Sequence, residues 1–316
     1  MTEQKQQSAA ELPDDVTLQA AEQLAVRAVT AAGAFISERF GGPLEVMQKA
    51  DRDGVDIVTD VDKASQNLIV SMIEERFPDH QILGEEDPPE NEPPPEDFVW
   101  AIDPIDGTKN FVNGSTTHAV SVGLLYRGVS VAGAIWTPWP GEKGYALIHA
   151  RSGNGTWMDG TRVRVNGAKG EGVPEAGRLA AVPGGLRGSF DIEKPLQGNL
   201  GELRMTGSTC YEMMMVATGS MQYALNGYSS VWDYAAGLVL VREAGGVSMT
   251  PGPNGWREIT GWQQFFTKEP DAFKQMRSWK GNILSSSHTT AKFVSTNLTP
   301  KRRPGLLRRA WRNVTS

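Results

Sequence analysis

The sequence WAIDPIDGTKNF, residues 100–111, is the most informative stretch of this 316-residue chain. An apolar run that starts at Phe98 leads into it and predicts a buried strand. Asp103 stands at the end of that strand, where open α/β sheets bind their ligands. Asp106 follows closely enough for both carboxylates to hold Mg²⁺. Gly107–Thr108 then offers N–H groups and a hydroxyl at a predicted helix start, which suits a phosphate. The pattern indicates hydrolysis or transfer of a phosphate ester.

An alternative is that residues 103–107 form two successive surface turns, because Asp-Pro and Asp-Gly pairs favour turns. Other acids argue against it. Glu85 follows a short apolar strand, Asp62 precedes a helical stretch at 63–77, and Asp233 opens another helical stretch that ends near residue 244. Each acid alone is explained as a loop charge or a helix cap. Several acids that each end or open an apolar element favour a common site.

Three segments together resemble the signature segments of the inositol monophosphatase family. They are Gly84–Glu86, residues 103–108, and Trp232–Gly237 with the Glu-Ala-Gly-Gly run at 243–246. The segments occur in family order, and the resemblance extends from about Leu18 to Phe266. The family contains Mg²⁺-dependent, lithium-sensitive phosphomonoesterases. The implied fold is a layered α/β structure, with alternating α-β-α-β-α layers and mixed, largely antiparallel sheets.

The resemblance implies ligands for two or three Mg²⁺ ions. Glu85, Asp103 and the carbonyl of Ile105 would hold the first ion. Asp103, Asp106 and Asp233 would hold the second, and Glu85 would reach a third through water. A phosphate monoester is a dianion that repels an anionic nucleophile, and two or three cations remove that repulsion.

The resemblance also implies roles around the phosphate. Asp62 and Thr108, with Glu85, would serve the attacking water, whereas Asp56 matches a family acid to which no role is assigned. The implied substrate-binding residues are Gly107, Thr108, Gly207, Ser208, Thr209, Asn226 and Asp233.

Asn226 departs from the inositol-specific members of the family, which carry a Glu that binds ring hydroxyls shortly before the Trp-Asp pair. An ungapped alignment on Trp232–Asp233 places Asn226 at that position. A neutral amide binds a hydroxyl less strongly than a carboxylate does. Inositol 1-phosphate, histidinol phosphate, fructose 1,6-bisphosphate and a 3′-phosphoadenosine nucleotide therefore stay open as substrates. Alternatively, Asn226–Gly227 is a simple turn.

Composition excludes several other classes of protein. Cys210 is the only cysteine and lacks the Arg-rich flank of a cysteine phosphatase, so we expect a small buried apolar residue there. The four histidines show no metal-ligand spacing. A single cysteine, a polar N-terminus and the lack of a long apolar run predict a cytoplasmic protein without a transmembrane segment. The net charge of −6 argues against general nucleic-acid binding.

The predicted organisation is a disordered tail at 1–14, a catalytic domain at 15–270, and a linker with a basic tail at 285–316. The catalytic domain would have an N-terminal α+β half to about residue 150 and a C-terminal α/β half. From Lys301 on, the tail has six basic residues and no acid, with apolar residues at helical spacing. It would bind an anionic membrane, RNA or a protein, dock on the acidic body, or stay disordered. A homodimer is implied by family resemblance, and a non-catalytic regulatory relative is the rival to the enzyme.

Overall fold

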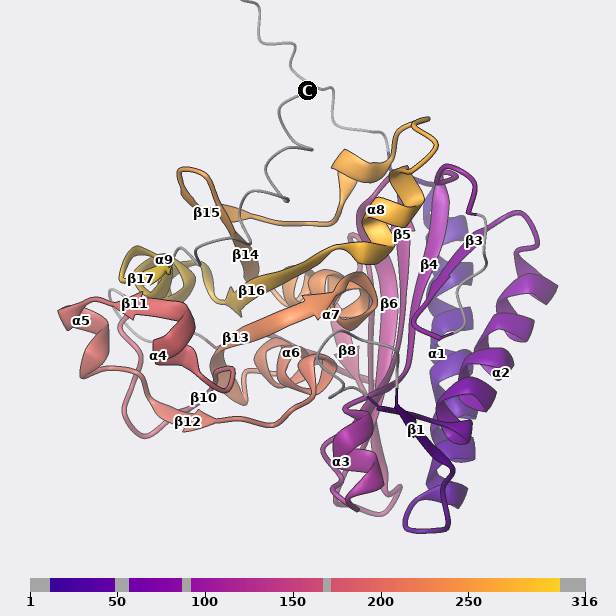
Figure 1. Cartoon of the computed structure of the whole chain (residues 1–316), viewed down its shortest axis with the longest axis horizontal. Coiled ribbons are helices and arrows are strands. Elements are labelled where there is room, and N and C mark those ends of the chain that lie inside the picture. Colours follow the sequence, from indigo (N-terminus) through magenta and orange to yellow (C-terminus); the bar gives the residue numbers. More distant parts are fainter. Residues whose placement is uncertain (1–11, 49–56, 87–91, 167–171, 302–316) are drawn as a thin grey trace, which may run out of the picture.

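The computed structural model describes residues 12–48, 57–86, 92–166 and 172–301. Helices and sheets alternate across the molecule in layers, as Figure 1 shows. The predictions for the N-terminal tail before residue 12, for Asp56, and for the basic tail after Lys301 lie outside the described residues. Within the described ranges, no helix is long and apolar enough to cross a membrane.

The first layer consists of α1 (Asp15–Arg39) and α2 (Asp60–Arg76). The predicted helical stretch at 63–77 is confirmed as α2, which begins three residues earlier, at Asp60. The side chain of Asp14 caps α1, and that of Thr59 caps α2. Asp62 is not the N-cap residue of α2, because it lies inside the first turn and accepts a hydrogen bond from the Thr59 backbone.

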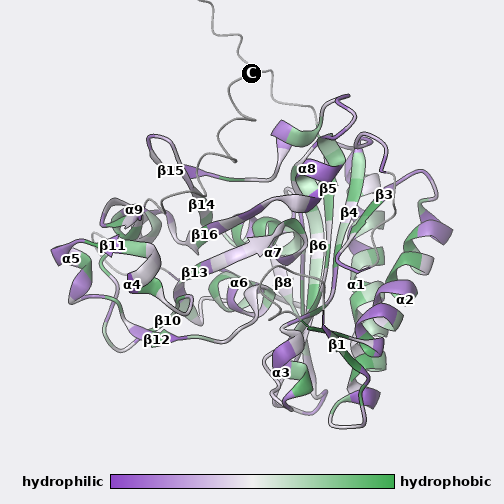
Figure 2. Ribbon diagram, in the orientation of Figure 1, coloured by the Kyte–Doolittle hydropathy of each residue, from purple (hydrophilic) through white to green (hydrophobic). Residues whose placement is uncertain are grey.

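The second layer is a seven-stranded sheet with the order β3-β4-β5-β6-β7-β8-β9, in which only β3 and β4 pair in parallel. Its strands are β3 (Gln81–Gly84), β4 (Phe98–Asp106), β5 (Ala119–Tyr126), β6 (Val129–Pro138), β7 (Tyr145–Arg151), β8 (Thr156–Met158) and β9 (Thr161–Val163). Figure 2 shows hydrophobic residues concentrated along β4, β5 and α1. Because the sheet ends at Val163, the first half of the domain extends beyond the predicted boundary near residue 150.

The central layer consists of α6 (Thr209–Ala217) and α7 (Val231–Glu243), which lie between the two large sheets. Small residues let α7 approach β5 closely. A Cβ atom added at Gly123 would lie 2.6 Å from the backbone nitrogen of Ala236, so only glycine fits there. This close approach brings the start of α7, where Asp233 lies, against the sheet that carries β4.

The second sheet has six strands in the order β12-β10-β13-β16-β14-β15. β10 pairs in parallel with β12 and β13, and the other pairs are antiparallel. The strands are β10 (Leu179–Ala181), β12 (Glu202–Arg204), β13 (Met221–Ser230), β14 (Val247–Gly252), β15 (Gly255–Glu258) and β16 (Lys280–Ser286). The layered α/β fold with mixed, largely antiparallel sheets is therefore confirmed.

Short helices cover the outer face of the second sheet and share a hydrophobic core with it. They are α4 (Leu186–Ser189), α5 (Lys194–Gln197) and α9 (His288–Thr296). The remaining elements are α3 (Thr108–Val112), α8 (Ala272–Ser278), a 3₁₀ helix at Gln263–Phe265, and two small sheets that pair β1 (Val46–Gln48) with β2 (Ile57–Thr59) and β11 (Phe190–Ile192) with β17 (Leu298–Pro300).

The predicted linker that starts at residue 285 is wrong for residues 285–301. These residues complete β16, which pairs with both β13 and β14, and then form α9 and β17. The run of serines and threonines has the composition of a loop, but its hydroxyls are satisfied inside the sheet. Ser285 Oγ lies 2.8 Å from Ser248 Oγ, and Ser286 Oγ donates to the carbonyl of Gln222.

Candidate active site

The carboxylates of Asp103 and Asp106 lie at the end of β4 and are almost fully buried, with 1% and 6% of each residue exposed. The pairing of β4 with β5 shifts register between them, and the backbone N–H of Ile105 donates to Asp103 Oδ1 at 3.1 Å. Gly107 then turns the chain with a φ of +90°. This conformation favours glycine, and it places Thr108 at the start of α3. The alternative of two surface turns is therefore wrong.

The start of α6 holds Asp106 in place across the interface between the two halves. Ser208 Oγ donates to Asp106 Oδ2 at 2.6 Å, as does the backbone N–H of Cys210. The N–H of Thr209 donates to Oδ1 at 3.2 Å. A helix N-terminus favours a negative charge, yet burial raises the pKa of Asp106 to about 6. The predicted Ser208 and Thr209 therefore lie directly beside this acid.

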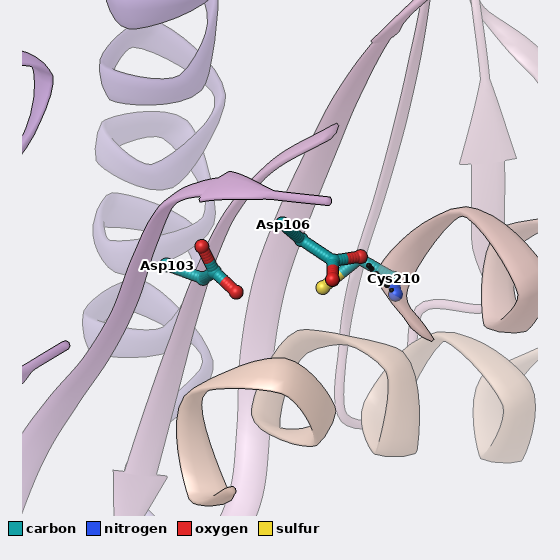
Figure 3. A group of neighbouring side chains, drawn as sticks. All are labelled: Asp103, Asp106 and Cys210. Carbon is teal, nitrogen blue, oxygen red and sulfur yellow. Dashed lines mark hydrogen bonds between the residues drawn. The ribbon is translucent and has the colours of Figure 1, made fainter. Parts of the chain in front are cut away.

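Cys210 lies closer to these acids than the sequence indicated. It is fully buried, as expected for a small apolar residue. Figure 3 shows its sulfur beside Asp106, with Asp103 next to them. One carboxylate oxygen of each Asp and the Cys210 Sγ lie within 4.8 Å of one another. The thiol donates to the backbone carbonyl of Asp233 at 3.1 Å, which links the starts of α6 and α7.

Asp233 joins the same cluster from the first turn of α7. Ser230 precedes the helix, and its backbone N–H donates to Asp233 Oδ2 at 2.5 Å in a capping box. Asp103 interacts with Asp233 as well and partly offsets the rise in its pKa. Desolvation, followed by the charges of Asp106 and Glu85, raises the pKa of Asp233 well above its ordinary value. Acids from β4, α7 and the end of β3 therefore repel one another here.

Asp62, Thr108 and Glu85 lie at the other side of the cluster. Thr108 Oγ1 lies 3.1 Å from both Asp62 Oδ1 and the carbonyl oxygen of Ile105, and it can donate to either. Burial, and then the charge of Glu85, raises the pKa of Asp62. The N–H of Glu85 donates to the carbonyl of Ile102 at 3.2 Å, which fixes the chain just after β3. Hydrogen bonds and charges thus link Asp62, Thr108 and Glu85 with the end of β4 and with Asp233.

Asn226 and Glu212 form a connection that the sequence did not indicate. Asn226 lies inside β13 rather than in a simple turn, and its Nδ2 donates to Glu212 Oε2 at 2.6 Å. Burial raises the pKa of Glu212 to about 7. One sequence signal was available: Glu212 is the only acid in the apolar helix α6, where it precedes three methionines.

The donor set fits a hard divalent cation. Two buried carboxylates at Asp103 and Asp106, two partly exposed ones at Glu85 and Asp233, and the carbonyl of Ile105 supply oxygen atoms of the kind that Mg²⁺ prefers. Burial raises the pKa values of Asp106 and Asp233, and a bound cation would stabilise the charged forms of both groups.

Comparison with known proteins agrees with this site. A model of the inositol monophosphatase family matches residues 17–287. The chain is similar to an inositol-1-monophosphatase of Bacillus subtilis, with 34% identity over 233 residues that cover 72% of this chain and 84% of that protein. It is also similar to a protein of Pseudomonas aeruginosa named Nus factor SuhB, with 29% identity over 293 residues, 90% of this chain and 98% of that protein.

Solved structures agree with the sequence comparison. An IMPase of Thermotoga maritima superimposes with a TM-score of 0.66 and 26% identity, covering 87% of this chain and 94% of that one. The family match, the sequence identity and the fold all indicate the same family. The chain belongs to the inositol monophosphatase family of phosphoric monoester hydrolases.

Proposed function

We propose that this chain is a Mg²⁺-dependent phosphomonoesterase that acts on a small phosphorylated alcohol such as inositol 1-phosphate. The observation that carries the proposal is the buried pair of Asp103 and Asp106, whose carboxylate oxygens lie within 4.8 Å of each other, together with Asp233, whose pKa the charge of Asp106 helps to raise. Mutually repelling buried carboxylates are unfavourable unless protons or cations neutralise them. At neutral pH, bound cations would neutralise these carboxylates.

In the proposed arrangement, Glu85, Asp103 and the Ile105 carbonyl would hold one ion. Asp103, Asp106 and Asp233 would hold a second, and Glu85 would serve a third. Bound Mg²⁺ would neutralise the phosphate dianion and lower the pKa of an attacking water. The ligands come from β4 and the end of β3 in the first large sheet and from α7 of the central layer, so folding of both halves is needed to assemble the site.

The chain's own residues would move the proton of the attacking water. Asp62 has a raised pKa, which brings its basicity closer to that needed of a general base near neutral pH. Thr108 Oγ1 lies 3.1 Å from Asp62 Oδ1, so a proton taken up at Thr108 can pass to that carboxylate. The N–H groups of Gly107 and Thr108 would donate to the phosphate. The alcohol half would lie against Gly207, Ser208, Thr209, Asn226 and Asp233.

A phosphate-release panel tests the proposal. The substrates are inositol 1-phosphate, histidinol phosphate, fructose 1,6-bisphosphate and a 3′-phosphoadenosine nucleotide, each with Mg²⁺ and with a chelator. We expect release from at least one substrate, only with Mg²⁺. Release that persists in the chelator, or no release from any substrate with Mg²⁺, would contradict the proposal.

A regulatory protein that acts by binding a partner is the second candidate. It is favoured by the similarity to the Pseudomonas aeruginosa protein named Nus factor SuhB, which spans 90% of this chain. The two candidates separate in the panel above, because a purely regulatory relative needs no Mg²⁺-dependent phosphate release.

We further propose a cytoplasmic homodimer whose phosphatase activity is lithium-sensitive. The basic tail after Lys301 would bind an anionic membrane, RNA or protein; a shortened chain ending at Pro300 tests this by loss of binding.

A further inference from the structure

The short peptide that carries Glu85 is held at three successive residues by three different parts of the fold. The carbonyl of Gly84 accepts a hydrogen bond from Arg277 Nη1, and the N–H of Glu85 donates to a carbonyl of β4 at 3.2 Å. Gln66 of α2 binds both backbone groups of Glu86, because its Oε1 accepts from the N–H at 2.9 Å and its Nε2 donates to the carbonyl at 2.7 Å. These bonds fix the direction in which the Glu85 side chain leaves the backbone.

Arg277 is the partner that comes from the C-terminal half of the chain. It lies near the end of α8, whose Phe273 and Met276 are buried in the hydrophobic core that contains α6 and α7. Its guanidinium also binds Glu92: Nε donates to Glu92 Oε1 at 2.6 Å, and Nη2 lies 2.5 Å from the same oxygen. Only 14% of the Arg277 side chain and 8% of the Glu92 side chain are exposed. Arg277 therefore ties the second half of the fold to the end of β3.

The planar guanidinium suits this double contact. Its donors point in fixed directions, so two nitrogens that face Glu92 leave the third, Nη1, aimed at the carbonyl of Gly84. The residue that follows Gly84 faces the acid cluster, because the charge of Glu85 helps to raise the pKa values of both Asp62 and Asp233. A shift of the Gly84 carbonyl would thus move a carboxylate that the site needs.

We propose that Arg277 is a positioning residue for Glu85. Paired with Glu92, it holds the Gly84 carbonyl and keeps the Glu85 carboxylate turned towards the metal site. Groups that orient a metal ligand typically change metal affinity by about tenfold or more when they are removed. The inference rests on the proposed function in one respect: Glu85 is a ligand of the bound cations.

The direction of the effect separates positioning from simple charge. Arg277→Met removes a positive charge, and by Coulomb's law alone this change would strengthen cation binding. Loss of positioning would weaken it. Arg277→Met combined with Glu92→Met removes both charges of the pair, so it changes no net charge and leaves no buried charge without its partner. If Arg277→Met alone does not fold, this charge-neutral double variant supplies the test.

Mn²⁺ binding to the full chain measures the effect without turnover. Dissociation constants are obtained at pH 8 by calorimetry and by the paramagnetic resonance signal of free Mn²⁺. In both variants we expect the ions that use Glu85 to bind about tenfold more weakly. The ion assigned to Asp103, Asp106 and Asp233 should keep its affinity within about twofold, because Glu85 does not contribute to it.

A second ion pair at the opposite end of β4 offers a matched control. Arg127 binds Asp97 through two hydrogen bonds, of 3.0 and 2.8 Å, just before β4 begins. Arg127→Met combined with Asp97→Met removes the same two charged groups from the same sheet. We expect this control to leave every Mn²⁺ dissociation constant unchanged within about twofold.

Hydrogen exchange of the metal-free protein in a chelator gives a readout that needs no cation. In the charge-neutral double variant, the amides of Glu85 and Glu86 should exchange at least about tenfold faster than in wild type, whereas the amides of β5 should not change. A general loss of stability would instead accelerate exchange in both places.

Unchanged or tighter Mn²⁺ binding in both variants overturns the positioning role, as does exchange that is accelerated equally at residues 85–86 and in β5. Wild type that binds no Mn²⁺ overturns the role together with the metal site. A selective loss of Mn²⁺ affinity, without phosphate release from any substrate by wild type, refutes the proposed enzyme and supports the positioning role. Mg²⁺-dependent release by wild type, with unchanged Mn²⁺ affinity in both variants, does the reverse.

Discussion

Replacement of Asp106 by Asn should stabilise the metal-free protein at high pH and destabilise it relative to wild type when Mg²⁺ is present. The folded protein holds the pKa of Asp106 at about 6, above the ordinary value of 3.8. For an acid with a raised pKa, the favourable contribution is complete below pH 3.8 and is lost as the pH rises through 6. At pH 8, metal-free wild type therefore carries an unneutralised buried charge that the variant lacks.

The magnitude follows from the pKa and from the hydrogen bonds of Asp106. The raised pKa of Asp106 lowers the free energy of unfolding of the metal-free wild type by about 3 kcal/mol at pH 8. At pH 5 the loss is roughly half of that. In the variant, the Asn oxygen can accept from Ser208 Oγ and the Cys210 N–H, while the new NH₂ faces the N–H of Thr209. The lost bond costs about 1 kcal/mol. The net gain is about 2 kcal/mol at pH 8 and only about 0.5 kcal/mol at pH 5.

Thermal unfolding in a chelator at both pH values measures the effect. A gain of about 2 kcal/mol raises Tm by roughly 4 °C in a chain of this size. Saturating Mg²⁺ should reverse the order, because only wild type keeps its full ligand set and gains from linkage. Asp271→Asn, at an exposed acid, is the matched control and should show neither effect. Equal stability of Asp106→Asn and wild type at pH 8, with and without Mg²⁺, would refute the reasoning.

Three further predictions concern the same cluster. Asp103→Asn should lower Mg²⁺-dependent phosphate release at least about a hundredfold at saturating Mg²⁺, and undiminished release would remove Asp103 from the ligand set. Ser208→Ala removes the hydroxyl that donates to Asp106 at 2.6 Å and caps α6, so denaturant unfolding should show a loss of about 1–2 kcal/mol; an unchanged midpoint would contradict this. Mg²⁺ binding at pH 6–7 should release protons from Asp106 and Asp233, whose pKa values are raised, and affinity should increase with pH. Calorimetry in buffers of different ionisation enthalpy measures the number of protons released. A release of zero protons would contradict the prediction.

The sequence predicted the parts of the site that depend on local pattern. The apolar run before Asp103 indicated β4. The Asp-Pro-Ile-Asp-Gly-Thr run indicated a turn that could bind metal and phosphate, because the residues that form it are adjacent in the chain. The sequence also indicated the two helical stretches next to Asp62 and Asp233. What brought the acids together was the family resemblance, since spacing along the chain does not show which elements meet.

Contacts between distant segments could not be predicted in this way. Asp106 and Ser208 are 102 residues apart, and no local pattern shows that the start of α6 caps this carboxylate. The bond between Asn226 and Glu212 joins a strand to a helix face and needs the packing of the second half. The prediction of a linker from residue 285 was wrong for a different reason. The serines of β16 have the composition of a loop, and the sequence does not show that their hydroxyls find partners inside a sheet.

The most direct test of the central claim is the anomalous signal of Mn²⁺, used in place of Mg²⁺, in crystals that also contain phosphate. We predict Mn²⁺ peaks coordinated by carboxylate oxygens of Glu85, Asp103, Asp106 and Asp233, with the phosphate bound to the same ions beside Gly107–Thr108. Mn²⁺ peaks elsewhere on the protein, with these carboxylates uncoordinated at saturating metal, would contradict the account.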